Sequence, residues 1–232
     1  MKIAKPQASQ GLEPIGGGKN LVHKGFLAFT LAEVLITLGI IGVVAAMTLP
    51  TLIQKHQRLV LETQLKKTYT TFSQGIQKAM ADDGVTSIKD TEIFNACKDE
   101  TPDACTQALE KYFKIVNFTD KNNKSREYIS ASPILENGKY ILKKYPYKYP
   151  IIAYEEDGYL YSLADGEQFT INCFERQDYC DIRFDINGEK GPNINGLDIH
   201  AYINISETGK IEGRYAHSTL TIIMENGWKI PW

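Results

Sequence analysis

Residues 28–50 read AFTLAEVLITLGIIGVVAAMTLP, an apolar stretch in which Glu33 is the one charged residue. No charge interrupts residues 34–49. A helix over residues 29–53, at about 1.5 Å per residue, is long enough to cross roughly 30 Å of hydrocarbon. We therefore predict a membrane-spanning helix there, in preference to a core helix of a soluble protein. Glu33 is costly in that setting unless a cation meets it, because opposite charges attract more strongly where the dielectric constant is low.

The apolar pattern changes period after residue 53. Apolar side chains recur at steps of three and four, as in an amphipathic helix: Leu61, Leu65, Tyr69, Phe72, Ile76 and Met80. No turn signal separates this part, residues 54–83, from the membrane-spanning part, so we predict one helix over about residues 29–81. Pro50 removes a backbone hydrogen bond and should bend or melt the helix near residues 46–50.

Residues 84–232 are predicted to form a globular head. A helical pattern covers residues 103–113, and most of the remainder is strand-like, including YCDIRFDI, IHAYINIS and STLTIIME. Turn pairs punctuate these runs, as in antiparallel hairpins: Asp157-Gly158, Asp165-Gly166, Asn187-Gly188, Thr208-Gly209 and Asn226-Gly227. The apolar face of the sheet needs a partner, which the stripe of the long helix supplies. We therefore predict an α+β fold, with a long N-terminal helix packed on a small antiparallel sheet.

The four cysteines form two close pairs in the sequence, Cys97 with Cys105 and Cys173 with Cys180. Disulfides in an oxidising compartment suit such pairs. Four cysteines allow three connectivities, of which we favour the local one because it closes short loops. Zinc is a weaker interpretation, since zinc sites usually draw on cysteines two to four residues apart. Free buried thiols are the remaining alternative.

Charge and motifs argue against two broad classes of function. The net charge of −2 gives no basic footprint for nucleic acid. The sequence contains no nucleophile elbow, phosphate loop, HExxH motif or dinucleotide fingerprint, and its four histidines are scattered. We therefore predict that the protein is not an enzyme.

The segment from Phe29 to Pro50 resembles the processing segment of type IV pilins and of the pseudopilins of type II secretion systems. In that family a prepilin peptidase cuts before a Phe and methylates the new amine, and a Glu follows four residues later, as Glu33 follows Phe29. Gly42 and Pro50 also fall where the family tends to have a helix-loosening Gly and Pro. The family's cut usually follows Gly, whereas Ala28 stands here.

The resemblance implies a pilin-like fold and a specific processing route. Residues 1–28, Gly-rich with scattered lysines, would be the leader, removed between Ala28 and Phe29. Cutting at Gly25-Phe26 would spoil the spacing to Glu33. The N-methylated Phe29 amine of one subunit would then pair with Glu33 of a neighbour, which sets the register of a helical filament.

The implied setting is the bacterial inner membrane. The protein would cross it once, with the leader in the cytoplasm and the head periplasmic or extracellular, and the basic leader supports this orientation. Its partners would be the peptidase, other pilins or pseudopilins, and an inner-membrane assembly platform. Two alternatives stay open: a secretory signal peptide cut near residues 44–46, and a plain single-span anchor for a head with a ligand or calcium site.

A Gly- and Asn-rich loop, FDINGEKGPNINGLD at residues 184–198, carries several oxygen-bearing side chains. Calcium takes six to eight oxygen ligands from loops that fold tightly. Candidate ligands are Asp185, Asn187 and Asp198. The spacing is not that of an EF-hand, and a turn-rich connection between strands is the simpler interpretation. No other cofactor is predicted.

Overall fold

The computed structural model describes residues 29–98, 102–119, 127–150, 159–176 and 178–232. The predicted leader, residues 1–28, lies outside these ranges, as does the predicted turn at Asp157-Gly158. The chain divides into two compact units, Met1–Thr48 and Leu49–Trp232. A long apolar N-terminal helix is followed by antiparallel sheet, which confirms the α+β class.

Helix α1 (Leu31–Asp82) runs for 52 residues, close to the predicted range, and contributes to both units. Residues 46–50 are helical, so the prediction that the helix melts near Pro50 is wrong. A proline removes only one bond of the helical ladder, whereas melting would leave several backbone groups of an apolar segment without partners. A bend at Pro50 stays a prediction.

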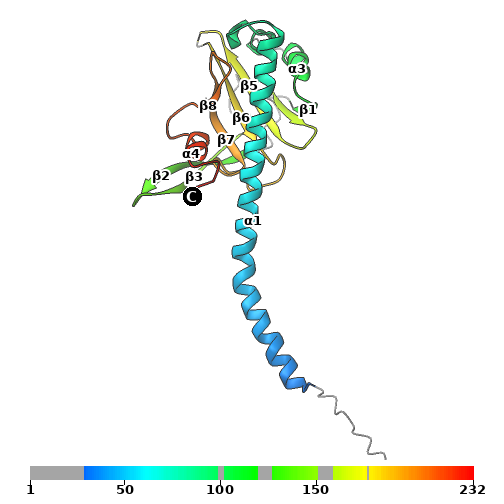
Figure 1. Ribbon diagram of the computed structural model, residues 1–232, viewed down its shortest axis with the longest axis vertical. Coiled ribbons are helices and arrows are strands. Elements are labelled where there is room, and N and C mark those ends of the chain that lie inside the picture. The colour runs from blue at the N-terminus through cyan, green and yellow to red at the C-terminus, as the bar shows by residue number, and fades with distance from the viewer. Residues whose placement is uncertain (1–28, 99–101, 120–126, 151–158, 177) are drawn as a thin grey trace, which may run out of the picture. The chain divides into compact units, whose positions relative to one another are not determined.

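The second unit is built on a six-stranded antiparallel sheet with the strand order β1-β4-β5-β6-β7-β8 (Figure 1). The strands are β1 (Ile115–Thr119), β4 (Leu160–Leu163), β5 (Gln168–Phe174), β6 (Tyr179–Asp185), β7 (Ile199–Ile205) and β8 (Ile211–Gly213). A separate hairpin consists of β2 (Glu127–Glu136) and β3 (Lys139–Pro150). Its turn residues, Asn137 and Gly138, both have positive φ, as a two-residue type I′ turn requires.

The amphipathic stripe of α1 packs on the six-stranded sheet, as predicted. Leu65 and Ile76 are fully buried, and Phe72 is 1% exposed. The Phe72 ring lies 4.7 Å from Phe169 of β5 and 4.8 Å from Phe184 of β6, measured between ring centroids. The helix therefore supplies one layer of the core, and the sheet supplies the other.

Short helices and two disulfides close one end of the head. The helices are η1 (Ile88–Asp90), α2 (Glu92–Cys97) and α3 (Pro102–Glu110), the last ending earlier than the predicted residue 113. Cys97 and Cys105 form a disulfide between α2 and α3. Cys173 and Cys180 form a second, between directly opposed positions of β5 and β6. The predicted local pairing is confirmed, and zinc binding and free thiols are excluded for these residues.

One predicted strand is a helix. STLTIIME contains α4 (Thr219–Glu225), with Ser218 at its N-cap position and Asn226-Gly227 ending it. Leu220, Ile222 and Ile223 are buried. The β-branched residues favour strands locally, but this spacing also places apolar side chains on one side of a helix, and packing on the core decides between the two.

The other strand predictions agree better with the structure. YCDIRFDI contains β6, and IHAYINIS contains β7. Asp165-Gly166 connects β4 to β5, and Thr208-Gly209 connects β7 to β8. Gly209 has φ +73°, and a Cβ there would lie 2.4 Å from the sulfur of Met80, so this turn needs glycine to approach α1.

Candidate processing and assembly site

The start of α1 is closed by reciprocal hydrogen bonds between Thr30 and Glu33. Glu33 Oε2 accepts from the Thr30 backbone N–H at 2.8 Å and from Thr30 Oγ1 at 2.9 Å. The Glu33 N–H donates in turn to Thr30 Oγ1 at 3.2 Å. This is a capping box, in which N–H groups that lack a partner inside the helix gain acceptors. The carboxylate is thus held at the first turn, beside the predicted cut.

The predicted cut lies just before the helix. Ala28 is outside the described residues, whereas Phe29 is 83% exposed and not yet helical. Thr30, whose backbone N–H donates to Glu33, directly follows Phe29 in the chain. An amine at Phe29 would therefore directly precede the residue that binds the Glu33 carboxylate of its own chain.

Thr30 is a site residue that the sequence analysis did not predict. The signal was present, because Thr30-x-x-Glu33 ahead of an apolar run is the sequence pattern of a capping box. The sequence analysis predicted only a cation from outside the chain as the partner of Glu33, whereas Thr30 of the same chain also bonds its carboxylate.

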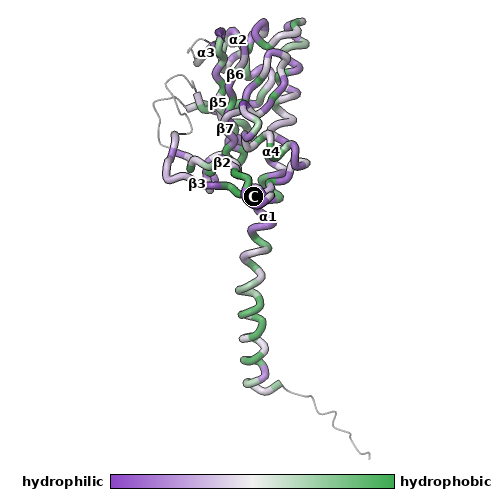
Figure 2. The backbone as a smooth tube through the Cα atoms, turned by 90° about the vertical axis from the view of Figure 1, so that its left-hand side faces the viewer, coloured by the Kyte–Doolittle hydropathy of each residue, from purple (hydrophilic) through white to green (hydrophobic). Residues whose placement is uncertain are grey.

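The part of α1 that follows Glu33 exposes its apolar side chains. Figure 2 shows mostly hydrophobic colouring along it, with paler stretches between. Exposed fractions range from 41% for Val34 to 74% for Met47 among the large apolar side chains: Val34, Leu35, Ile36, Leu38, Ile40, Ile41, Val43, Val44, Met47, Leu49, Leu52 and Ile53. Within the described residues, α1 is the one helix long and apolar enough to span a membrane. These side chains require lipid or other apolar surfaces as surroundings.

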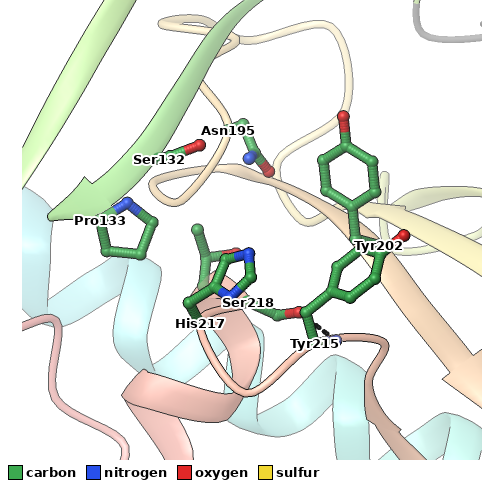
Figure 3. A pocket seen from close by; sticks show the side chains of 8 residues that line it. Ser132, Pro133, Asn195, Tyr202, Tyr215, His217 and Ser218 are labelled. Carbon is green, nitrogen blue, oxygen red and sulfur yellow. Dashed lines mark hydrogen bonds between the residues drawn. The ribbon is translucent and has the colours of Figure 1, made fainter.

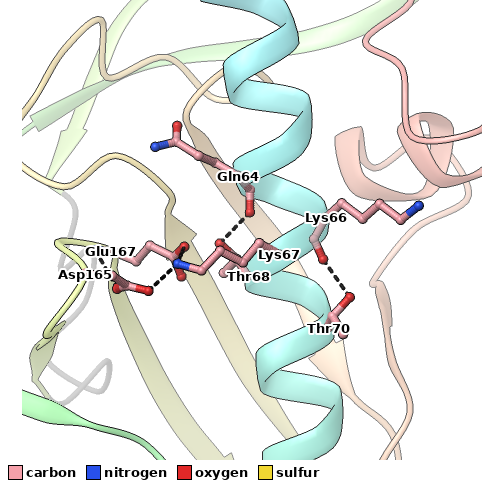
Figure 4. Close-up of polar contacts among 7 residues, drawn as sticks. All are labelled: Gln64, Lys66, Lys67, Thr68, Thr70, Asp165 and Glu167. Carbon is pink, nitrogen blue, oxygen red and sulfur yellow. Dashed lines mark hydrogen bonds and ion pairs between the residues drawn. The ribbon is translucent and has the colours of Figure 1, made fainter.

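A lysine on α1 joins the helix to the sheet inside the head (Figure 4). Lys67 Nζ lies 3.1 Å from Glu167 Oε1 and also donates to Asp165, which belongs to the turn between β4 and β5. The hydrogen bond to Asp165 raises the pKa of Lys67. Glu167 is only 3% exposed, and this burial raises the pKa of its carboxyl. Lys67 thus compensates a buried acid and fixes α1 on the sheet.

The predicted calcium ligands lie together, in a loop closed by their own hydrogen bonds. Asp198 accepts from the Ile194 N–H at 2.8 Å through Oδ1 and from the Asn193 N–H at 2.7 Å through Oδ2. Asn187 Nδ2 lies 3.3 Å from Asp198 Oδ2, and the Asn187 N–H lies 3.4 Å from Asp185 Oδ1. Backbone groups thus already use both Asp198 oxygens, as a turn requires. Among the described residues, no group of three or more His, Cys, Asp or Glu side chains is placed to hold a metal. Calcium binding stays a prediction.

The comparisons with known proteins add one partial match. A family model described as a family of unknown function (DUF6613) matches residues 51–141, which is less than half of the chain. Neither the curated proteins nor the solved structures gave a match. The matched range covers α1 from residue 51, the helices η1, α2 and α3, the strands β1 and β2, and the first residues of β3.

Proposed function

We propose that the protein is a structural subunit of a helical filament rooted in the bacterial inner membrane, either a type II secretion pseudopilus or a type IV pilus. Prepilin peptidase cuts after Ala28, and the new N-terminus at Phe29 is methylated. Copies then pack through their apolar helices, with Glu33 of one copy facing the amine of the next. The head adopts the corresponding pilin-like arrangement, with α1 packed on the sheet.

The observation that carries the proposal is the position of Glu33. Its carboxylate is fixed at the start of a helix whose following side chains are apolar and exposed. A single-span anchor accounts for the apolar side chains but does not require an acid at this end. A filament of like helices accounts for both, because apolar packing fills the surface and a nearby amine neutralises the acid.

The location follows from the disulfides and the leader. Two disulfides in the head support an oxidising compartment outside the cytoplasm. The lysines of residues 1–28 support a cytoplasmic leader, because positive charge is retained on that side of the membrane.

The first experiment is N-terminal sequencing and mass spectrometry of the protein extracted from membranes. The expected first residue is N-methylated Phe29. Any other N-terminus contradicts the processing step, and a cut near residues 44–46 would instead support a secretory signal peptide.

The second experiment separates the charge of Glu33 from its role in capping. Glu33→Gln keeps an oxygen that Thr30 can donate to but removes the charge, whereas Glu33→Ala removes both. We expect both variants to lose filament assembly, measured by cross-linking in membranes, with Phe29 still at the N-terminus. Glu110→Gln, an exposed acid at the end of α3, is the matched control. If the protein were only a membrane-anchored binding protein, neither Glu33 variant would change the cross-linking between copies. That result would contradict the filament proposal.

A further inference from the structure

A pocket of about 280 Å³ opens on the head, and its lining includes none of the residues that the proposed function uses (Figure 3). Its walls come from β2, β7, the segment after β8 and the start of α4. The volume lies just below the usual range of small-molecule sites, roughly 300–1,000 Å³. It therefore has room for one ring-sized group.

Aromatic rings form one side of this pocket. The centroids of Tyr202 and Tyr215 lie 6.2 Å apart, and His217 stacks on Tyr215 at 5.5 Å with an angle of 9° between the rings. Tyr202 is 49% exposed and Tyr215 is 47% exposed. Half-exposed rings that border a pocket offer apolar surface to a ligand without leaving the fold.

The backbone at Tyr202 is held in a conformation that a bulky residue rarely adopts. Its φ is +60°, in the left-handed region. The Arg214 N–H donates to the Tyr202 carbonyl at 2.7 Å and helps to hold it there. Such strain persists where the surrounding structure enforces it, and it clusters at ligand sites. Here it fixes the direction of one of the rings that line the pocket.

Uncharged polar groups in fixed positions also line the pocket. Asn195 Nδ2 donates to the Ala131 carbonyl at 2.8 Å, and Asn195 Oδ1 accepts from the Ala201 N–H at 3.2 Å. Ser218 Oγ accepts from the Tyr215 N–H at 2.9 Å. An amide has further donor and acceptor capacity beyond two bonds, and a serine hydroxyl that accepts one bond can still donate. Both residues are buried apart from the pocket that they line, and they keep hydrogen-bonding capacity for a ligand hydroxyl.

The charges around the pocket oppose a cationic ligand. No Asp, Glu, Lys or Arg is among the described residues that line it. The Arg214 guanidinium lies 5.9 Å from the Tyr215 ring centroid, where it repels cations. His200 lies behind Thr219, and burial lowers the pKa of this histidine to about 4, so it is neutral near pH 7. The site thus combines aromatic surface and uncharged hydrogen-bonding groups, and no carboxylate that would hold a cation is among the described residues that line it.

We propose that this pocket binds one pyranose ring of a neutral saccharide. The C–H face of the sugar packs on the Tyr202 ring and on the exposed part of Tyr215, a ring that also contacts His217 and Arg214. The sugar hydroxyls bond Asn195 and Ser218. A sugar ring matches the site because it has apolar C–H faces and a rim of uncharged donors and acceptors. The inference is independent of the filament proposal, since it uses none of residues 28–53.

The test is calorimetric titration of the full chain in lipid nanodiscs, because maltoside and glucoside detergents would compete for the pocket. The probes are triacetylchitotriose, cellotriose and maltotriose, which distinguish N-acetylated from plain glucose units, and tetramethylammonium chloride as a cation. We expect at least one trisaccharide to bind with a millimolar or lower Kd, and tetramethylammonium not to bind.

Pocket variants decide whether the binding belongs to this site. Tyr202→Gly removes a ring and relieves the positive φ, so it should fold at least as well as the wild type. Tyr202→Gly and Tyr215→Ala should each weaken binding about tenfold or more. Tyr147→Ala removes a ring that is 61% exposed on β3, outside the pocket, and should leave Kd unchanged. The proposal is overturned if no trisaccharide binds, if both pocket variants bind as the wild type does, or if only tetramethylammonium binds.

Discussion

Acid should destabilise the head through His200. This side chain is fully buried, and burial lowers its pKa from 6.5 to about 4, opposed in part by the Leu197 backbone. In the unfolded chain the ring regains water and its ordinary pKa, so the unfolded state binds a proton at pH values where the folded state does not. The stability linked to His200 is therefore fully present above about pH 6.5 and is lost as the pH falls toward 4.

The size of this effect follows from the two pKa values. The difference between 6.5 and about 4 corresponds to a contribution of about 3 kcal/mol to the free energy of unfolding, lost in full once the pH is below both values. Between pH 7 and pH 5 the same linkage gives a loss of about 2 kcal/mol. For a domain of this size, such a loss lowers Tm by roughly 4–8 °C.

Tryptophan fluorescence provides the assay. Trp228 and Trp232, the two tryptophans of the chain, both pack against the core of the head, so their signal follows unfolding of this unit. Urea unfolding of the full chain at pH 7 and pH 5 should show the loss of about 2 kcal/mol in the wild type. It should also appear in His56→Gln, a control at an exposed position of α1. Gln cannot take up the proton that His200 binds in the unfolded chain. The free energy of unfolding of His200→Gln should therefore fall by about 2 kcal/mol less than that of the wild type between pH 7 and pH 5. An equal loss in His200→Gln would show that other groups cause the acid sensitivity.

Three further perturbations address how the head is held together. Phe72→Ala removes a buried ring that contacts both β5 and β6, so it should lower the free energy of unfolding by about 3–5 kcal/mol in urea titrations. A loss below about 1 kcal/mol would contradict this packing. Lys67→Ala should lower it by about 1–3 kcal/mol at pH 7, because Glu167 stays buried without its ion pair. Since burial raises the folded pKa of Glu167, the loss should shrink as the pH falls toward 4, and the double variant with Glu167→Gln should recover most of it. Replacing Cys173 and Cys180 by Ala should cost about 2.5 kcal/mol on the chain-entropy model for so short a loop, and unchanged unfolding midpoints would refute it.

Features set by local pattern were predictable from the sequence. The apolar run, the stripe ending at Met80 and the absence of a turn signal predicted α1 to within a few residues at each end. The short spacing of the cysteines predicted their pairing, because each pair needs only adjacent elements to meet. Both the helix and the cysteine pairing depend mainly on residues that are close in the sequence.

Features that depend on tertiary context or on small signals were not predicted. The helix α4 contains β-branched residues, and its burial against the core is not visible in a window of eight residues. The hairpin of β2 and β3 was not assigned, although Asn137-Gly138 is a strong type I′ signal. The pocket was also missed, because it joins β2, β7 and α4, which are distant in sequence.

In the filament that we propose, the capping box changes what Glu33 can contribute to assembly. Within one chain its carboxylate already accepts two hydrogen bonds from Thr30, so a neighbour's amine does not meet a bare charge. Pairing with the amine therefore replaces or supplements hydrogen bonds that the carboxylate already has. The free energy gained is smaller than that of bringing together two isolated ions in a medium of low dielectric constant. The exposed apolar side chains of residues 34–53, by contrast, gain packing contacts in proportion to the helix length that they bury. We therefore expect helix packing to supply most of the affinity between copies, and Glu33 to select the one register in which acid and amine coincide.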